Sequence, residues 1–298
     1  MNKLAPIVIF TYNRPDKLKV LISSLQNNSL ASQSDLYIYS DGPKPDSISK
    51  VNLVREYIHT IEGFKSINII ESSTNKGLAT SIIQGVTDIV NTYGRIIVLE
   101  DDLIVNNQFL SYMNYALTKY ENMENVYSVS GYSFLSKGCY PDFPEYYFLP
   151  IICSWGWATW KNKWSVFDPN AIGYKQLKTN SVLREEFNYK YFYSDMLIWQ
   201  MEQKKIPGRI KILLHKKYKQ DSWAIRWYWS VFTHHGLTLY PKETLIENDG
   251  FDGSGTHCGI SKGGSKINFN ITNPYTSMPD SVYLNQEVCK AVKEEIKH

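Results

Sequence analysis

Apolar and polar positions alternate in a regular order over the first hundred residues. Residues 5–10, APIVIF, form a short apolar run that predicts a strand, and apolar side chains then recur at helical spacing through residues 16–26. The order continues with predicted strands at 35–40, 66–72 and 95–100 and predicted helices at 47–61 and 78–93. Short apolar strands that alternate with amphipathic helices are typical of βαβ units. We therefore expect a Rossmann-like α/β fold whose mainly parallel central sheet carries helices on both faces.

The second half of the chain has a weaker pattern. Residues 107–122 predict a helix and residues 126–134 a further strand, but residues 138–165 are rich in Pro, Gly and aromatic side chains. Helical patterns return around 181–204 and in a mixed-charge segment at 284–298. We expect one continuous domain with a soft boundary near Gly131, which divides it into residues 1–130 and a more irregular part, residues 131–298.

Polar residues follow four of the predicted strands directly. The segments are TYNR (11–14), SDG (40–42), TNKG (74–77) and EDD (100–102). Because ligands of parallel α/β sheets bind beyond the carboxyl ends of the strands, these segments predict one shared binding crevice. The sequence has neither the GxGxxG pattern of dinucleotide-binding folds nor the GxxxxGK[ST] pattern of a P-loop after these strands.

Three adjacent carboxylates lie at the end of the strand RIIVLE. Glu100, Asp101 and Asp102 repel one another, and two of them at the end of a buried strand are costly unless a cation or solvent screens them. Mg²⁺ and Mn²⁺ bind through one or two carboxylates and leave other positions for water and phosphate oxygens. An acidic turn exposed to water is the alternative, but the position between two apolar segments favours a metal site.

Composition and charge narrow the function classes. The chain has 298 residues, 43% of them hydrophobic, and a formal net charge of +3, which gives no reason to expect a nucleic-acid partner. Its 22 Tyr and 8 Trp residues suit sugar stacking as well as ordinary cores. The four cysteines form no CxxC pair, so neither a zinc site nor a disulfide framework is indicated. No segment approaches 18 uninterrupted apolar residues. We expect a cytoplasmic protein, and a peripheral contact with the inner face of the membrane stays open.

Taken in order, several segments resemble a known family. PIVIFTYNRPDKLKVLISSL, YSDG, NKGLATSI and LEDDLIV are similar to segments of GT-A fold glycosyltransferases, in which such an acidic motif holds a metal on a nucleotide-sugar pyrophosphate. SWGWATWKNKW (154–164), DSWAIRW (221–227) and a later GTH resemble the N-acetylglucosaminyltransferase that begins complex N-glycans and bacterial surface-polysaccharide transferases of the family 2 type. The similarity spans roughly residues 5 to 258.

This resemblance implies roles for individual residues in binding the donor. It implies that residues 1–130 bind the nucleotide sugar and that Asp102 ligates the metal, Mn²⁺ or Mg²⁺. It further implies that Glu100 and Asp101 contact the sugar hydroxyls or the ribose. The remaining donor-binding residues that it implies are Thr11, Asn13, Arg14, Asp41, Asn75 and Lys76. For Lys76, a solvated turn lysine is an equal alternative.

An inverting transferase also needs a carboxylate that takes the proton of the incoming hydroxyl. Asp221, at the start of DSWAIRW, is the first candidate, although the family has two acidic residues where this chain has Asp221 and Ser222. Asp195 is the second candidate. A helix N-cap is the alternative role of Asp221.

Two further features complete the expected site. The segment NDGFDGSGTHCG (248–259) is glycine-rich, and the resemblance implies that His257 in it reaches the metal or the pyrophosphate; an incidental loop histidine is the alternative. Trp155 and Trp157 flank Gly156, and their rings could bind the apolar faces of a sugar. For the pair His234 and His235, packing at a helix end is favoured over ligation.

The sequence as a whole predicts a metal-dependent, inverting glycosyltransferase. Its partners would be a nucleotide-sugar donor, with UDP favoured and N-acetylglucosamine as a weaker expectation, and a glycan or lipid-linked saccharide acceptor of the bacterial cell surface. Two alternatives stay open: a nucleotidyltransferase of sugar phosphates, which would normally have glycines after the first strand, and a non-catalytic carbohydrate-binding protein, which would not need EDD at a strand end.

Overall fold

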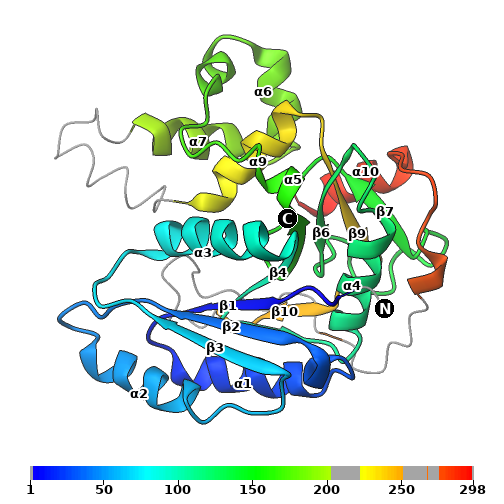
Figure 1. The fold of residues 1–298 in the computed structure, drawn as a ribbon. Helices are drawn as coiled ribbons and strands as arrows, with labels where there is room; N and C mark the ends of the chain where they lie inside the picture. Colours follow the sequence, from blue (N-terminus) through cyan, green and yellow to red (C-terminus); the bar gives the residue numbers. More distant parts are fainter. Residues whose placement is uncertain (1–2, 203–221, 251–266, 268–274, 297–298) are drawn as a thin grey trace.

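The computed structural model describes residues 3–202, 222–250, 267 and 275–296. Within these ranges an eight-stranded sheet has the order β3-β2-β1-β4-β8-β6-β9-β7 (Figure 1). Its strands are β1 (Ile7–Thr11), β2 (Asp35–Ser40), β3 (Ser66–Glu71), β4 (Arg95–Glu100), β6 (Val126–Ser130), β7 (Tyr146–Leu149), β8 (Trp157–Trp160) and β9 (Leu237–Pro241). A two-stranded sheet pairs β5 (Leu103–Val105) with β10 (Ile246–Asn248) in antiparallel fashion.

The first four strands are parallel, as the alternation of strands and helices predicts. β1 pairs in parallel with both β2 and β4, and β2 pairs in parallel with β3. The other half of the sheet is mixed, because β8 is antiparallel to β4 and β6, while β6 and β9 are parallel. The sheet therefore joins strands from both sides of residue 131, and the division into two parts there stays a prediction.

The helices lie on both faces of this sheet. They are α1 (Pro15–Gln26), α2 (Ile48–Ile58), α3 (Leu78–Tyr93), α4 (Phe109–Lys119), α5 (Lys161–Trp164), α6 (Ser181–Asn188), α7 (Tyr193–Glu202), α9 (Trp223–Thr233) and α10 (Gln286–Glu295). Figure 1 shows α1 and α2 below β1–β3 and α3 above them. Every helix predicted from the sequence is confirmed, and the stretch around 181–204 forms two helices instead of one.

The strands bury alternate side chains on opposite faces. In β1, Ile7 and Ile9 pack with α1 and α4, whereas Val8 and Phe10 pack with α3. All five β1 residues are buried, so this strand has the continuous apolar character of a parallel strand covered twice. α3 then ends at Gly94, whose φ of 80° belongs to the left-handed region that glycine tolerates best.

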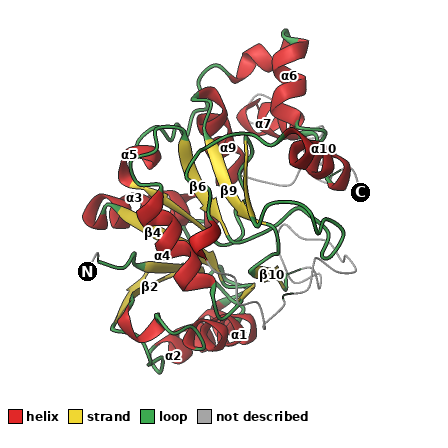
Figure 2. Ribbon diagram, turned by 90° about the vertical axis from the view of Figure 1, so that its right-hand side faces the viewer, coloured by secondary structure: helices red, strands yellow, loops and turns green. Residues whose placement is uncertain are grey.

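Aromatic residues form the core of the second half. α6 and α7 pack together, α7 also contacts α9, and this group lies uppermost in Figure 2. Trp157, Trp164 and Trp227 gather on the α3 face of the sheet, and the ring of Trp157 stacks on Trp223 with centroids 5.2 Å apart. Most of the aromatic residues noted in the sequence therefore contribute to core packing.

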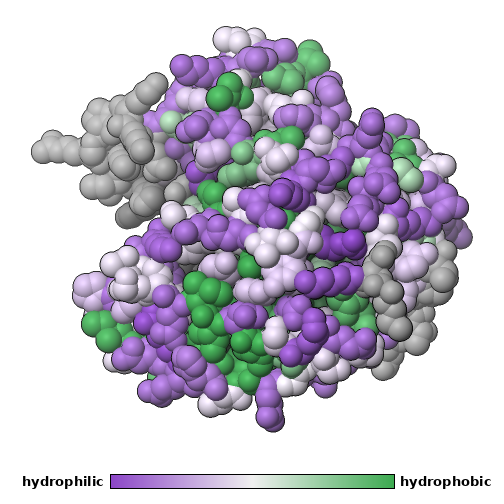
Figure 3. All heavy atoms as spheres, in the orientation of Figure 1, coloured by the Kyte–Doolittle hydropathy of each residue, from purple (hydrophilic) through white to green (hydrophobic). Residues whose placement is uncertain are grey.

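The outer surface is mainly polar in the view of Figure 3, with hydrophobic side chains gathered along the edge strand β3. None of the helices within the described ranges is long and apolar enough to cross a membrane.

Candidate active site

The acidic motif lies where the sequence places it, at the carboxyl end of β4. Glu100 is the last residue of that strand, and Asp101 and Asp102 form the turn that leads into β5. Asp101 is 2% exposed and Asp102 8% exposed. Burial, followed by the neighbouring Asp102 and Asp101, raises the pKa of Glu100 to about 8, while Arg14 acts in the opposite direction. Two buried carboxylates and a third with a raised pKa therefore share one strand end.

Asp101 is tied to the end of β1. Its Oδ2 accepts hydrogen bonds from Thr11 Oγ1 at 2.9 Å and from the backbone N–H of Tyr12 at 3.2 Å. Burial raises the pKa of Asp101, whereas Arg14 and the bonds from Thr11 and Tyr12 act in the opposite direction. Asp101 thus joins two neighbouring strand ends, and its carboxylate is largely occupied by protein donors.

Arg14 pairs with both aspartates. Its Nη2 binds Asp101 Oδ1, and its Nη1 binds Asp102 Oδ2 at 2.9 Å. Burial lowers the pKa of Arg14, but the two carboxylates outweigh burial and raise it above the ordinary value. The sequence resemblance implies a donor-binding role for Arg14, and no pattern in the sequence signals this pairing.

Asp41, for which the resemblance implies a role in donor binding, binds the loop that follows β3. Its Oδ1 accepts from the N–H groups of Gly42 and Lys76, and its Oδ2 accepts from the Gly77 N–H and the Asn75 amide, all at 2.8–3.2 Å. A Cβ on Gly42 would lie 2.3 Å from the carbonyl carbon of Thr74, so these two loops pack backbone against backbone. In this structure Asp41 organises the crevice, and four protein N–H groups occupy its carboxylate.

The residues before α3 are held by these same bonds. Asn75 Nδ2 also donates to Gly42 O at 2.8 Å, and the Lys76 ammonium donates to Gln84 of α3 at 3.0 Å. The N–H groups of Lys76 and Gly77 both donate to the Asp41 carboxylate. A helix start favours negative charge, and at these two positions Asp41 supplies that charge. Asn13 is half-buried beside Arg14 at the end of β1.

Residues 248–250 lie against Asp102, a contact that the sequence did not predict. β10 pairs with β5 so that Asn248 lies opposite Leu103, and the Asp249 N–H donates to the Asp102 carbonyl at 2.8 Å. Lys17 of α1 binds the Asp249 carboxylate at 2.7 Å. The Asp-Gly pair in this glycine-rich segment was the only signal in the sequence for a close backbone approach.

Trp155 and Trp157, both expected to bind sugar, lie in different environments. Trp157 is 1% exposed and lies in the core, so its ring offers no face to a ligand in this structure. Trp155 is half-buried and meets Tyr132 edge to face at 4.8 Å. Gly156 has a φ of 52°, and a Cβ on it would collide with Ile246 at 1.7 Å. The glycine is therefore required by its backbone conformation and by core packing.

No described contact links the candidates for the catalytic base, Asp221 and Asp195, to the acidic motif. Asp195 lies in the first turn of α7, is 42% exposed and binds Arg184 of α6 at 2.5 Å. Asp221 and His257 lie outside the described residues. The N-cap of α9 is Ser222, whose side chain accepts from the Ile225 N–H, so the capping role considered for Asp221 belongs to its neighbour. His234 caps the end of α9 and binds Ser230 O at 2.8 Å, which confirms helix-end packing.

The carboxylate oxygens at the end of β4 suit a hard divalent cation as ligands. Among the described residues no three His, Cys, Asp or Glu side chains converge as a complete metal cage. Mg²⁺ and Mn²⁺ need only one or two carboxylates when water and phosphate oxygens supply the other ligands. A Cβ on Gly250 would lie 2.3 Å from Asp102 Oδ2, so the backbone of Gly250 closely approaches this oxygen, which Arg14 Nη1 also binds. Asp102 stays the candidate ligand that the sequence resemblance implies.

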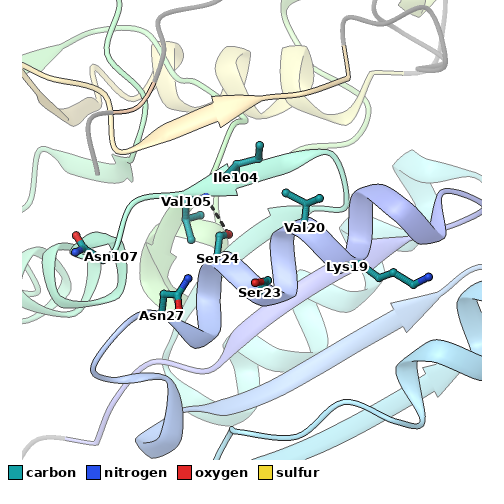
Figure 4. A pocket seen from close by; sticks show the side chains of 8 residues that line it. All are labelled: Lys19, Val20, Ser23, Ser24, Asn27, Ile104, Val105 and Asn107. Atoms are coloured by element: carbon teal, nitrogen blue, oxygen red, sulfur yellow. Dashed lines mark hydrogen bonds between the residues drawn. The ribbon is translucent and has the colours of Figure 1, made fainter. Parts of the chain in front are cut away.

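A separate open cavity of about 390 Å³ lies between α1 and β5 (Figure 4). It is lined by Lys19, Val20, Ser23, Ser24, Asn27, Ile104, Val105 and Asn107. The Ser24 hydroxyl accepts the Val105 N–H at 3.1 Å across its floor. No residue of the acidic motif lines this cavity, so it is not part of the candidate site.

One protein family model matches the part of the chain that contains this site. Residues 7–137, which include β1–β4 and the acidic motif, match the model of the family described as glycosyl transferase family 2. No curated protein sequence matches the chain. Among solved structures, a Mn²⁺ and GDP-mannose complex of the mannosyltransferase PcManGT from Pyrobaculum calidifontis is 10% identical, with a TM-score of 0.38, and the match covers 77% of this chain and 74% of that one.

Two further matches are to longer proteins. GalNAc-T7, solved with UDP, GalNAc and Mn²⁺, is 10% identical with a TM-score of 0.44, and the match covers 81% of this chain and 43% of GalNAc-T7. Residues 1–349 of S. aureus TarS are 13% identical with a TM-score of 0.30, over 42% of this chain and 34% of TarS. The chain thus spans less than half of the length of these two proteins.

The sheet with flanking helices and the acidic motif at its ligand edge define an α/β protein of the GT-A type. The match to the glycosyl transferase family 2 model covers residues 7–137, the segment that carries this motif. The fold class predicted from the sequence is confirmed.

Proposed function

We propose that this chain transfers a sugar from a nucleotide-diphosphate donor, UDP-linked in the first instance, to a hydroxyl of a cell-surface glycan of the bacterial type. The family match supports sugar transfer from a nucleotide sugar. The acceptor class and the inversion of the anomeric centre come from the sequence resemblance.

One observation carries the proposal: the acidic motif lies at the carboxyl end of β4, inside the family-matched segment and next to the end of β1. Thr11 and Asp101 join the two strand ends through a hydrogen bond of 2.9 Å. The carboxyl ends of parallel strands are where α/β folds bind nucleotides. A carbohydrate-binding module has no need of buried carboxylates at this place.

A divalent cation, Mn²⁺ or Mg²⁺, would be held by Asp102. When bound, such a cation neutralises the charge that develops on the leaving nucleoside diphosphate. Asp101 anchors the turn through Thr11 and Tyr12, so that Asp102 is presented at a fixed position. Asp41 fixes the loop 75–77 that borders the crevice.

The proton of the acceptor hydroxyl would be taken by Asp221, with Asp195 as the second choice. Asp221 precedes Ser222 at the start of α9, and Asp195 is engaged by Arg184 in this structure. Asp221→Asn is expected to abolish transfer while calorimetry still detects donor binding. Near-normal transfer by Asp221→Asn would assign the proton transfer to Asp195, where the same substitution would then abolish it.

The direct test of the proposed function is a panel of nucleotide sugars, each incubated with Mn²⁺, Mg²⁺ or chelator. We expect turnover of one donor that stops on chelation and falls at least about a hundredfold in Asp102→Asn, in line with the loss of one charge-stabilising group. Turnover indifferent to chelation and to Asp102→Asn would contradict the metal assignment, and no turnover of any donor would contradict the function.

A further inference from the structure

Arg14 lies in the short turn between the end of β1 and the start of α1. It occupies the N-cap position of α1, directly before Pro15, whose ring restricts the backbone. From this position its guanidinium binds one oxygen of Asp101 and one oxygen of Asp102 at the same time. A planar fork with several N–H donors suits two carboxylates in a way that a lysine ammonium does not.

Two lysines of the same sheet edge, Lys17 and Lys76, bind other partners. Lys17 binds the carboxylate and the carbonyl of Asp249 at 2.7 and 2.8 Å. Lys76 binds Gln84. Among the described hydrogen bonds and ion pairs, Arg14 is therefore the cation that compensates Asp101 and Asp102 directly. Its side chain is 20% exposed, so water screens this pairing less than it screens a surface ion pair.

We propose that Arg14 is the resident counter-ion of the acidic motif and that it sets the affinity of Asp102 for a divalent cation. This inference rests on the proposed function, because the cation concerned is the one that would meet the donor's phosphates. Arg14 holds Asp102 Oδ2, and it places a positive charge beside the oxygens that a metal would use. A cation that arrives alone must therefore compete with Arg14, and it binds weakly.

A bound nucleoside diphosphate would change the competition between the metal and Arg14 for Asp102. Its phosphates bring negative charge next to the metal and offer the guanidinium another anion, since Arg binds phosphate in the same bidentate way as carboxylate. Metal and nucleotide are then expected to bind cooperatively, and the coupling must be equal in both directions. Without Arg14 the metal would bind more tightly alone and would gain less from the nucleotide.

The test measures Mn²⁺ binding by electron paramagnetic resonance, with and without UDP, for the wild type and for Arg14→Gln. Loss of one positive charge close to the carboxylates is expected to tighten binding of Mn²⁺ alone by about tenfold or more. The tightening of Mn²⁺ binding by UDP should shrink in the same variant. Lys19→Gln removes a charge from an exposed position of the same helix and should leave Mn²⁺ binding unchanged.

If Arg14→Gln does not fold, Arg14→Lys keeps the charge but loses the fork that holds both carboxylates, and Mn²⁺ should bind it more tightly than wild type by a smaller factor. Equal or weaker Mn²⁺ binding by the folded variant overturns the proposal, and so does an absence of Mn²⁺ binding in all proteins. Tighter binding in a protein that turns over no nucleotide sugar would instead uphold Arg14 and contradict the proposed function.

Discussion

Gly250 lies so close to Asp102 that a methyl group on its α-carbon would be 2.3 Å from Asp102 Oδ2. The contact exists because β10 pairs with β5 and brings residues 248–250 back to the acidic turn. The Asp249 N–H holds the Asp102 carbonyl at 2.8 Å from the same side. The backbone of one segment thus shapes the space around the carboxylate of another.

Gly250→Ala is predicted to weaken metal binding. The added methyl group must push Asp102 or the 248–250 backbone aside, because it cannot occupy the same space as the carboxylate. We expect Mn²⁺ affinity to fall by about tenfold, corresponding to about 1.4 kcal/mol, with little change in melting temperature. Gly138→Ala serves as a control for Mn²⁺ affinity alone, since a Cβ there meets nothing within 4 Å but the φ of 75° strains the backbone of an alanine. Equal Mn²⁺ affinity in Gly250→Ala and wild type would show that the contact does not shape the site.

Thr11→Val tests the hydrogen bond that joins β1 to β4. Valine keeps the shape of threonine but cannot donate to Asp101 Oδ2, which leaves a buried carboxylate with one donor fewer. We expect a loss of about 1–3 kcal/mol in the free energy of unfolding, measured by urea denaturation. Thr92→Val removes an exposed hydroxyl that bonds only within α3, and it should cost much less. Equal losses in the two variants would contradict a special role for the Thr11 hydroxyl.

Asp41→Asn tests the loop anchor. An amide can accept at only one of its two positions, and its NH₂ group would face the N–H groups of neighbouring residues. We expect a loss of about 2–4 kcal/mol in stability, since hydrogen bonds to a charged acceptor are strong. Asp46→Asn changes an exposed carboxylate in the same loop and serves as the control. A near-normal melting temperature for Asp41→Asn would refute the anchoring role.

Local patterns were enough to predict the first half of the fold. β1 to β4 and α1 to α3 follow the two periodicities of the chain, and the acidic motif follows from its place after a buried strand. β5 and β10 have only three residues each, and β7 and β8 only four, so their patterns are too short to recognise. Their pairing partners lie far away in the sequence.

The roles of single side chains were harder to predict than their positions. An Asp after a strand, such as Asp41, can face a ligand or its own backbone, and the sequence does not show which N–H groups surround it. Trp157 lies in a motif with Gly156, yet both faces of β8 are covered, so that all four of its residues, Trp157 included, are buried. The pairing of Arg14 with Asp101 and Asp102 depends on the distance between two neighbouring strand ends, which no local pattern records.

Cys153 gives a prediction on pH dependence. Burial raises the pKa of its thiol to about 12, so the reactive thiolate is scarce at neutral pH. Cys139 is exposed, and we expect iodoacetamide to modify it before Cys153 in the native protein at about pH 8. Modification of Cys153 should accelerate as pH rises towards 12, which peptide mapping by mass spectrometry can follow. Equal rates at the two cysteines at about pH 8 would contradict the raised pKa of Cys153.

The central claim is that Asp102 holds a divalent cation on which a nucleoside diphosphate binds. Calorimetric titration of UDP, with GDP as a second probe, into the wild-type protein and Asp102→Asn tests it most directly, in Mn²⁺ and in chelator. We predict that one nucleotide binds wild type in Mn²⁺, and that chelation or Asp102→Asn weakens this binding at least about tenfold. Binding of equal strength under all three conditions would contradict the claim.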